Sequence, residues 1–321
     1  MVALAYPDRI AQRRPGGEAQ YRLSNGRGAV IRDGSDALAR DSWLAVAEVD
    51  GDARLAKIFL AAALTAAEIE AEFSDQIEVV TVIAWDEREQ AVLARRQRRL
   101  GELVLADEAL KDPDPARVTA VLLEGLGSLG LSVLPWTADL QAWRARVEFV
   151  HGVEGEAAGW PDLSDGALLE GLADWLGPLV PGMTRASHFK RLDLTAALQG
   201  MLSWDQRRRL DELAPTHLSV PSGSKVPIDY SAGEVPVLAV RVQEMFGATV
   251  HPAVAGGRIP LLLHLLSPAH RPVQITRDLP GFWTNSYPAV RADLRGRYPK
   301  HPWPDDPLSA PPTNRTKRRA G

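Results

Sequence analysis

The chain has 321 residues, of which 45% are hydrophobic and 24% charged, so it has enough apolar material for two ordinary globular domains. It contains no cysteine, which excludes disulfides, thiolate zinc sites, iron–sulfur clusters and thiol catalysis. No run approaches about 18 consecutive apolar residues, and the first residues lack the pattern of a secretory signal. We therefore expect a cytoplasmic protein that makes no contact with a membrane.

The formal net charge is −4, but the charge is unevenly distributed. Residues 258–321 hold 11 lysine and arginine residues against 4 acidic ones, whereas residues 1–257 hold 26 against 37. This asymmetry favours a polyanion as a partner of the C-terminal end. A basic tail that simply faces water explains it equally well.

Residues 1–98 are predicted to form an OB-like Greek-key β-barrel. Short apolar or alternating runs end at turns such as Asp50-Gly51, and the capping-box pattern of Thr65 to Glu68 predicts a short helix before the last hairpin. The predicted strands are 21–23, 29–31, 43–49, 54–60, 78–85 and 91–95. Other small barrels have the same number of strands.

Residues 99–307 are predicted to form a mixed C-terminal domain, which makes the fold class α+β. Its helical part, 112–214, contains amphipathic helices whose tryptophans we expect in the core rather than as base-stacking platforms. These are Trp143, Trp160, Trp175 and Trp204. Its second part, 215–307, combines hairpins near 216–230 and 260–276 with short helices, and residues 308–321 are predicted to be a disordered basic tail.

The motifs of an ATPase are missing from the chain. No G-x-x-x-x-G-K-[ST] phosphate loop and no Asp-Glu-Ala-His run occur, so ATP hydrolysis by that route is not expected. The histidines lack metal-ligand spacing, and Ser222-Gly223-Ser224 lacks the surroundings of a nucleophile elbow, which leaves a structural turn. We predict no catalytic residue, no metal and no cofactor in this chain.

Several stretches are similar to a known family. Residues 4–14 and 21–29 resemble the entry into the OB-type domain of DEAH-box helicases. Residues 210–217, 220–224, 265–279 and 296–304 (Gly-Arg-Tyr-Pro-Lys-His-Pro-Trp-Pro) resemble the HrpB branch of those helicases. The resemblance extends over residues 3–319 and identifies the chain with the C-terminal, non-motor portion of HrpB-type DEAH-box ATP-dependent helicases.

This resemblance implies a part of an ATP-dependent, RNA-directed helicase. The two RecA-like motor domains, with their ATP and Mg²⁺, would lie before Met1. Two origins fit this arrangement: a longer protein divided at a domain boundary, or a reading frame that begins late. The implied partners are RNA or single-stranded nucleic acid and the helicase motor domains.

Candidate nucleic-acid contacts follow from the basic residues, because guanidinium groups pair with phosphates and aromatic rings stack on bases. The first cluster surrounds the predicted first strands, and a second cluster lies in the last hairpin, where we expect nucleic-acid contact less than at the first. A third lies in the proline-rich segment near the C-terminus, followed by a basic tail. The members are Arg9, Arg13, Arg14, Arg22 and Arg27; Arg95, Arg96, Arg98 and Arg99; Arg291, Arg295, Arg297, Tyr298, Lys300 and Trp303; and Arg315, Lys317, Arg318 and Arg319.

Each cluster also has a structural interpretation. The arginines could pair with acidic helices or pack on the motor, Trp303 could attach its segment to the domain, and Asp305-Asp306 is expected to be a solvated pair. Two functions therefore compete: an accessory nucleic-acid-binding module, and a scaffold that holds the motor or recruits a protein. Both predict an apolar surface within residues 1–60. An independent enzyme has no site to support it.

Overall fold

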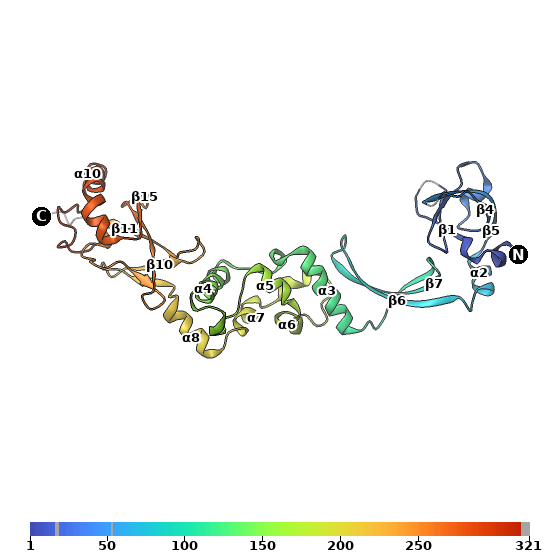
Figure 1. Cartoon of the computed structure of the whole chain (residues 1–321), viewed down its shortest axis with the longest axis horizontal. Helices are drawn as coiled ribbons and strands as arrows, with labels where there is room; N and C mark the ends of the chain where they lie inside the picture. Colours follow the sequence, from blue (N-terminus) through green and yellow to red (C-terminus); the bar gives the residue numbers. More distant parts are fainter. Residues whose placement is uncertain (17–18, 53, 316–321) are drawn as a thin grey trace. The chain divides into compact units, whose positions relative to one another are not determined.

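The computed structural model describes residues 1–16, 19–52 and 54–315, and the chain divides into two compact units. The first unit comprises residues 1–128 and 180–188, and the second comprises residues 129–179 and 189–321. Figure 1 shows strands and helix α2 near the N-terminus and helix α10 near the C-terminus. The mixture of strands and helices confirms the predicted α+β class.

The first unit begins with a closed five-stranded barrel, as predicted. Its strand order is β1-β2-β3-β5-β4, with β1 paired to β4 and with β3 and β5 parallel. The elements are α1 (Val2–Ala5), η1 (Pro7–Arg9), β1 (Ile10–Arg13), β2 (Gln20–Leu23), β3 (Gly28–Val30), η2 (Ala37–Arg40), β4 (Trp43–Val49) and β5 (Leu55–Leu64). Buried side chains that include Tyr21, Leu23, Leu44 and Ile58 fill the barrel.

The barrel ends earlier than the sequence analysis places it. After helix α2 (Ala66–Glu72), which carries the predicted capping box at Thr65, the next strands form a separate antiparallel sheet in the order β6-β7-β8. These strands are β6 (Ile77–Asp86), β7 (Ala91–Leu100) and β8 (Leu103–Ala109). The predicted boundary at residue 98 falls inside β7. The last predicted hairpin is therefore not part of the barrel.

The new sheet touches the barrel through the turn between β7 and β8. The backbone N–H of Glu102 donates to the carbonyl of Ser24 (2.9 Å). Gly101 has a φ of +54°, and a β-carbon there would overlap the Ser24 carbonyl, so glycine permits this approach. Leu100 and Leu103 join a buried cluster with Ile69. Helix α3 (Pro115–Leu129) follows, and its Gly125 lies against the Trp85 ring.

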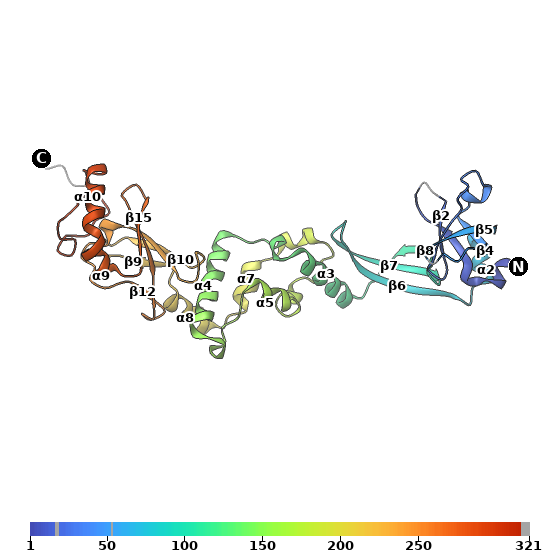
Figure 2. The same cartoon turned by 45° about the horizontal axis from the view of Figure 1, so that its top comes forward.

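The helical part of the second unit is built from short helices that pack through a few buried leucines and valines. Figure 2 shows these helices turned by 45°. Their bounds are η3 (Leu131–Val133), α4 (Ala138–Glu154), η4 (Glu156–Ala158), α5 (Asp165–Glu170), α6 (Leu172–Trp175), η5 (Gly177–Leu179), η6 (Ala186–Arg191), α7 (Leu194–Gly200) and α8 (Trp204–Leu213). Of these, η6 begins in the segment assigned to the first unit.

The remainder of the second unit is a five-stranded sheet with C-terminal helices, in line with the predicted hairpins. The strand order is β15-β14-β11-β10-β9, and β11 runs parallel to β14. The elements are β9 (His217–Ser219), β10 (Lys225–Asp229), β11 (Val237–Arg241), η7 (Val242–Glu244), β12 (Ala253–Val254), β13 (Ile259–Pro260), β14 (Leu262–Leu266), β15 (Pro272–Thr276), α9 (Leu279–Gly281), the π-helix η8 (Phe282–Ser286) and α10 (Tyr287–Arg297).

The described part of the predicted tail differs from the expectation of disorder. The N–H of Thr313 donates to the carbonyl of Gln243 (3.0 Å), and the amide of Asn314 donates to Ser224 Oγ (3.2 Å). Because four prolines between Pro304 and Pro312 restrict the backbone, a few such bonds suffice to place it. Residues 316–321, and with them Lys317, Arg318 and Arg319, lie outside the described residues.

Candidate nucleic-acid interface

Three of the five barrel arginines are engaged within the protein. Arg9 donates to the Ala47 carbonyl (3.1 Å) and lies over the Tyr6 ring, 4.7 Å from its centroid. Arg22 forms an ion pair with Glu102 (2.6 Å). Arg27 donates to the backbone carbonyl of Asp52. These three side chains therefore make contacts within the protein, as the alternative to nucleic-acid binding requires.

Arg13, Arg14 and Arg27 retain unused hydrogen-bonding capacity. Arg14 is exposed, and the Nε atoms of Arg13 and Arg27 are buried with no hydrogen-bond partner among the described residues. The neighbouring Tyr21 is fully buried and donates its hydroxyl to the carbonyls of Leu38 and Asp41. Burial raises the pKa of this hydroxyl above its ordinary value. Tyr21 is a core residue that no base can reach.

The arginines of strand β7 are largely matched by neighbouring side chains. Arg95 pairs with Asp107 and Arg98 with Glu70, each at 2.9 Å, and Arg99 donates to Gln97 Oε1 (2.8 Å). The pKa of Asp107 lies below its ordinary value, chiefly because of the hydrogen bond from Arg95. Arg96 is exposed. Arg95 and Arg98 are therefore neutralised by acids, whereas Arg96 and Arg99 form no ion pair with any residue that the structure describes.

Near the C-terminus, acidic neighbours again take up part of the charge. Arg291 donates to the Trp303 carbonyl (3.0 Å) and forms an ion pair with Asp305, and Arg297 pairs with Asp293 one helical turn earlier (3.1 Å). Asp305 and Asp306 are predicted to be a solvated pair. The Asp305 side chain is 91% exposed, in agreement with that prediction, and it also pairs with Arg291.

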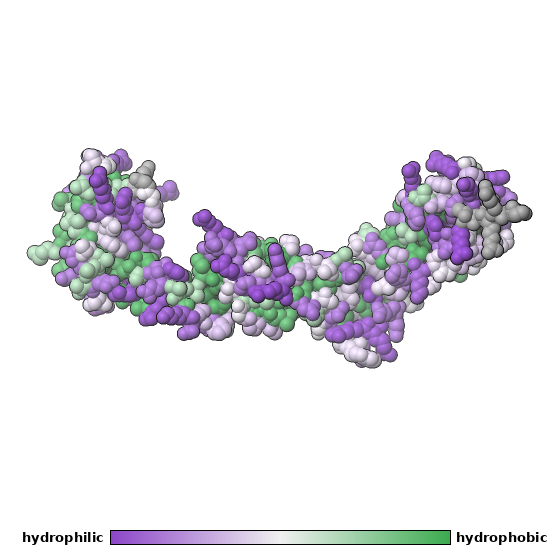
Figure 3. Space-filling model, turned by 180° about the vertical axis from the view of Figure 1, so that it is seen from behind, coloured by the Kyte–Doolittle hydropathy of each residue, from purple (hydrophilic) through white to green (hydrophobic). Residues whose placement is uncertain are grey.

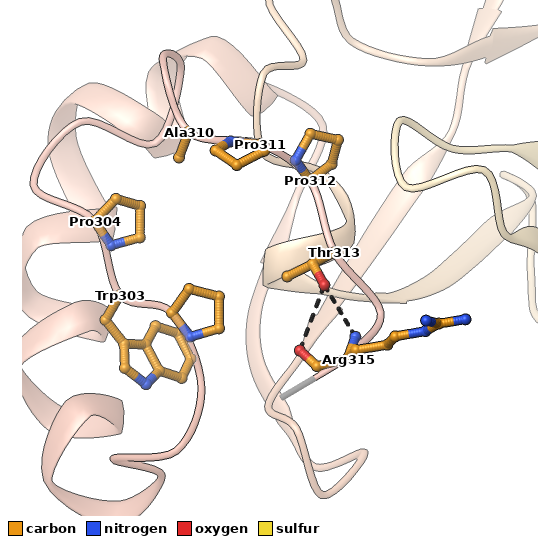
Figure 4. Close-up of a pocket in the computed structure, with 8 residues that line it drawn as sticks. Trp303, Pro304, Ala310, Pro311, Pro312, Thr313 and Arg315 are labelled. Atoms are coloured by element: carbon orange, nitrogen blue, oxygen red, sulfur yellow. Dashed lines mark hydrogen bonds between the residues drawn. The ribbon is translucent and has the colours of Figure 1, made fainter. Parts of the chain in front are cut away.

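Trp303 does not offer a ring for stacking, contrary to its selection as a candidate contact. It is 7% exposed, and its indole N–H donates to the Tyr298 carbonyl (2.9 Å). Figure 4 shows it beside Pro304 and across a hollow from Ala310 and Pro311. The proline-rich segment folds back on helix α10, and burial of the indole holds it there. Tyr298 is half-buried and packs edge-on against His301, 6.4 Å between centroids.

Arg295 and Lys300 remain as the free cations of this cluster. Both are exposed, and neither forms an ion pair or hydrogen bond with any residue that the structure describes. They lie in the last turn of helix α10 and just beyond it. This position suits positive charge, because the helix dipole is negative there.

A largely buried polar cluster joins the turn at Ser222 to the residues that follow strand β11, a contact that the sequence does not predict. Glu244 accepts from Arg241 (2.8 Å) and from Ser222 (2.9 Å), and Ser222 also lies 3.1 Å from Ser224. Burial alone would raise the pKa of Glu244, but hydrogen bonds from both serines and from Arg241 outweigh it, so that pKa lies below its ordinary value. The Ser-Gly-Ser turn is therefore structural, as predicted, but it is held by a carboxylate.

The same cluster reaches the segment after helix α10. The side chain of Gln243 is fully buried, and its amide nitrogen lies 2.8 Å from His301 Nδ1. Burial, followed by the charge of Arg241, lowers the pKa of His301 below its ordinary value. The arginine and glutamate three residues apart, 241 and 244, were the available sequence signal. Ser222, 22 residues from Glu244, and His301, 58 residues from Gln243, gave no such signal.

Trp204 contradicts its predicted place in the core. It is 74% exposed at the start of helix α8, whereas Trp160 is buried. The guanidinium of Arg208 lies over its ring, 5.6 Å from the centroid. A tryptophan at the first helical position lies outside the repeating apolar face, and periodicity therefore does not define its burial.

Among the described residues, 1–16, 19–52 and 54–315, no helix is long and apolar enough to cross a membrane. Within the same ranges, no group of three or more histidine or acidic side chains converges as metal ligands would.

Two family models match the chain. Residues 175–307 match the model described as ATP-dependent helicase C-terminal, and residues 76–110 match the connector region of ATP-dependent RNA helicase HrpB. The ATP-dependent RNA helicase HrpB of Escherichia coli (strain K12) is 41% identical over 99% of this chain. The chain spans only 39% of that relative's length.

Solved structures agree with these matches. A crystal structure of the E. coli DExH-box NTPase HrpB has a TM-score of 0.60 and 40% identity, covering 98% of this chain and 39% of that one. A crystal structure of the E. coli DEAH/RHA helicase HrpB has a TM-score of 0.52 and 37% identity, covering 94% of this chain and 37% of that one.

Proposed function

Because the chain belongs to the HrpB helicase family and matches its connector and C-terminal regions, we propose that it is an accessory nucleic-acid-binding region of an ATP-dependent RNA helicase. ATP binding and hydrolysis would belong to motor domains outside this chain. We further propose that single-stranded RNA is the ligand and that the protein works in the cytoplasm.

One observation carries this proposal: Arg295 and Lys300 are exposed cations that pair with no acid among the described residues, at the end of a helix whose position is fixed. The buried rings of Phe246, Trp283 and Tyr287 pack on one another and hold the start of that helix against the segment after η7. Because the backbone is held in place and the two charges are not neutralised, they can meet phosphate oxygens.

The barrel supports a second contact. The parallel pairing of β3 with β5 and the closure of β4 on β1 favour the OB class, whose members bind single strands. Arg14 is exposed just after β1 and is the barrel cation that we propose for this contact.

The test is fluorescence anisotropy with labelled single-stranded RNA across a salt series. We expect micromolar binding that weakens as salt rises, and a smaller salt slope for the double variant Arg295→Ala/Lys300→Ala, by roughly 1 to 1.5 if each cation meets one phosphate. The matched control, Arg95→Ala/Arg98→Ala, removes two positive charges that are already paired with acids. An equal effect of both double variants, or no binding even at low salt, would reject the proposal.

A specific observation favours a second function, that of a scaffold for the motor. Large apolar side chains are exposed on the barrel and at its start, and Figure 3 shows hydrophobic residues on the barrel face that it displays. They are Met1, Leu4, Tyr6, Leu55, Phe59 and Leu60. Soluble proteins seldom leave such a group uncovered.

The scaffold function has its own test, analytical ultracentrifugation of this chain with the N-terminal remainder of the E. coli relative. A complex that is lost on replacing Phe59 and Leu60 by serine would support it. Absence of a complex with the unaltered chain would exclude it.

A further inference from the structure

Trp204 is an exposed aromatic residue whose neighbours along the chain are polar. In helices α7 and α8, all of whose residues the structure describes, it is the single exposed large apolar side chain, while Leu179 and Val250 are exposed elsewhere in the same unit. Its neighbours Ser203, Asp205 and Arg207 are polar and exposed. Protein-binding surfaces gather several apolar side chains, and a lone ring among charges lacks that character.

The backbone beneath Trp204 is held by four hydrogen bonds. Ser203 and Gln206 form a reciprocal capping box, with Ser203 N–H to Gln206 Oε1 at 2.8 Å and Gln206 N–H to Ser203 Oγ at 3.2 Å. The amide of Gln206 also donates to the Gly159 carbonyl (2.8 Å), and Arg207 donates to the Gln199 carbonyl (2.7 Å). The ring therefore projects from a fixed position, which lowers the entropic cost of stacking on it.

The charges next to the ring are of both signs, with Asp205 on one side and Arg207 and Arg208 on the following turn. Arg208 lies over one face of the indole and meets Asp205 only at 3.8 Å, in an exposed and therefore weak pair. The charge of Arg207 faces a neutral carbonyl. In contrast, Arg209 is paired with Glu154 (2.7 Å). Two cations next to the ring are thus available to an anionic partner.

We infer that Trp204 is a stacking platform for an unpaired base of a single-stranded nucleic acid, with Arg207 and Arg208 meeting its phosphates. A base presents a flat π face to the indole, and its backbone supplies the negative charge that the two arginines attract. The inference rests on the proposed nucleic-acid function and adds a contact far along the chain from Arg295 and Lys300.

Three substitutions at one position separate stacking from other roles, read by anisotropy with a single-stranded oligonucleotide. Trp204→Ala should weaken binding by roughly 5- to 150-fold, as expected for loss of one base–aromatic stack of about 1–3 kcal/mol. Trp204→Phe, which keeps a flat ring, should retain most of the affinity. Trp204→Leu, which is apolar without a π face, should behave like the alanine variant.

The matched control is Val250→Ala, which truncates another exposed apolar side chain of the same unit and should leave binding unchanged. Because Trp204 is exposed, all these variants should keep the circular dichroism spectrum and thermal midpoint. Photocrosslinking of a 4-thiouridine oligonucleotide should place the adduct in the peptide that contains Trp204.

The outcomes distinguish this inference from the proposed function. If the unaltered chain binds and Trp204→Ala binds equally well, the stacking inference is wrong and the proposed function stands. If the unaltered chain does not bind at all, both fail. If leucine preserves binding as well as phenylalanine does, the contact is an apolar protein-like one, and the stacking inference is again wrong.

Discussion

Gly125 lies on the buried face of helix α3, where it allows the Trp85 ring to approach the helix backbone. A β-carbon at position 125 would overlap that ring. Since the ring or the helix must then shift, we predict that Gly125→Ala lowers the free energy of unfolding by about 1–3 kcal/mol. Urea denaturation followed by circular dichroism measures this change.

Gly127 provides the control in the same helix. It is exposed, and a β-carbon there would meet nothing within 4 Å. Alanine is the better helix former, so Gly127→Ala should raise the free energy of unfolding by about 0.5–1 kcal/mol. If both substitutions raised the free energy of unfolding, Trp85 would not pack against Gly125.

At the scale of elements, the segment after helix α10 is attached by a contact that depends on a neutral histidine. Burial, and then the charge of Arg241, lowers the pKa of His301, which lies 2.8 Å from the Gln243 amide. The contribution of neutral His301 to the free energy of unfolding is fully present above the pKa of about 6.5 that a histidine has in the unfolded chain. It is lost as the pH falls through the lower pKa of His301 in the folded protein.

We therefore predict that His301→Gln makes the free energy of unfolding less dependent on pH between about 7.5 and 5, because glutamine cannot take up the proton. Urea denaturation at several pH values compares the two proteins, and the other histidines contribute equally to both. Identical pH dependence would mean that His301 is not held in its neutral form.

At the scale of the whole molecule, local patterns predicted much of the fold, and pairings between distant segments account for what they missed. The hairpin before Asp229 and the capping box at Thr65 depend on neighbours in the chain, and both are present. The parallel pairings of β3 with β5 and of β11 with β14 leave no such local signal. For the same reason, β6 and β7 resembled barrel strands, although they form a separate sheet in the order β6-β7-β8.

The candidate site shows the same difference between local patterns and contacts with distant segments. Arginine clusters are visible in the sequence, but whether a guanidinium is free depends on acids far along the chain, as with Arg22 and Glu102. Burial of Trp303 follows from a carbonyl five residues away and a chain that folds back. Exposure of Trp204 follows from its place at a helix start. Composition therefore predicts which kinds of side chain the surface carries, whereas packing determines which of them remain free to bind a ligand.

The charge of the whole chain leads to the last prediction. The net charge is −4, while residues 258–321 carry an excess of seven positive charges. Lys317, Arg318 and Arg319 contribute three of these. If they attract the nucleic-acid backbone without regard to sequence, a chain that ends at Arg315 should show a salt slope smaller by about 2 on single-stranded RNA, at roughly 0.7 per phosphate.

Trp204→Ala serves as the comparison, because the two changes should act through different physics. Loss of a stacked base should lower affinity by a similar factor at every salt concentration and leave the slope unchanged, whereas loss of the three cations should matter most at low salt and vanish at high salt. An unchanged slope in the shortened chain would assign the electrostatic part of binding to cations within residues 1–315, Arg295 and Lys300 first among them.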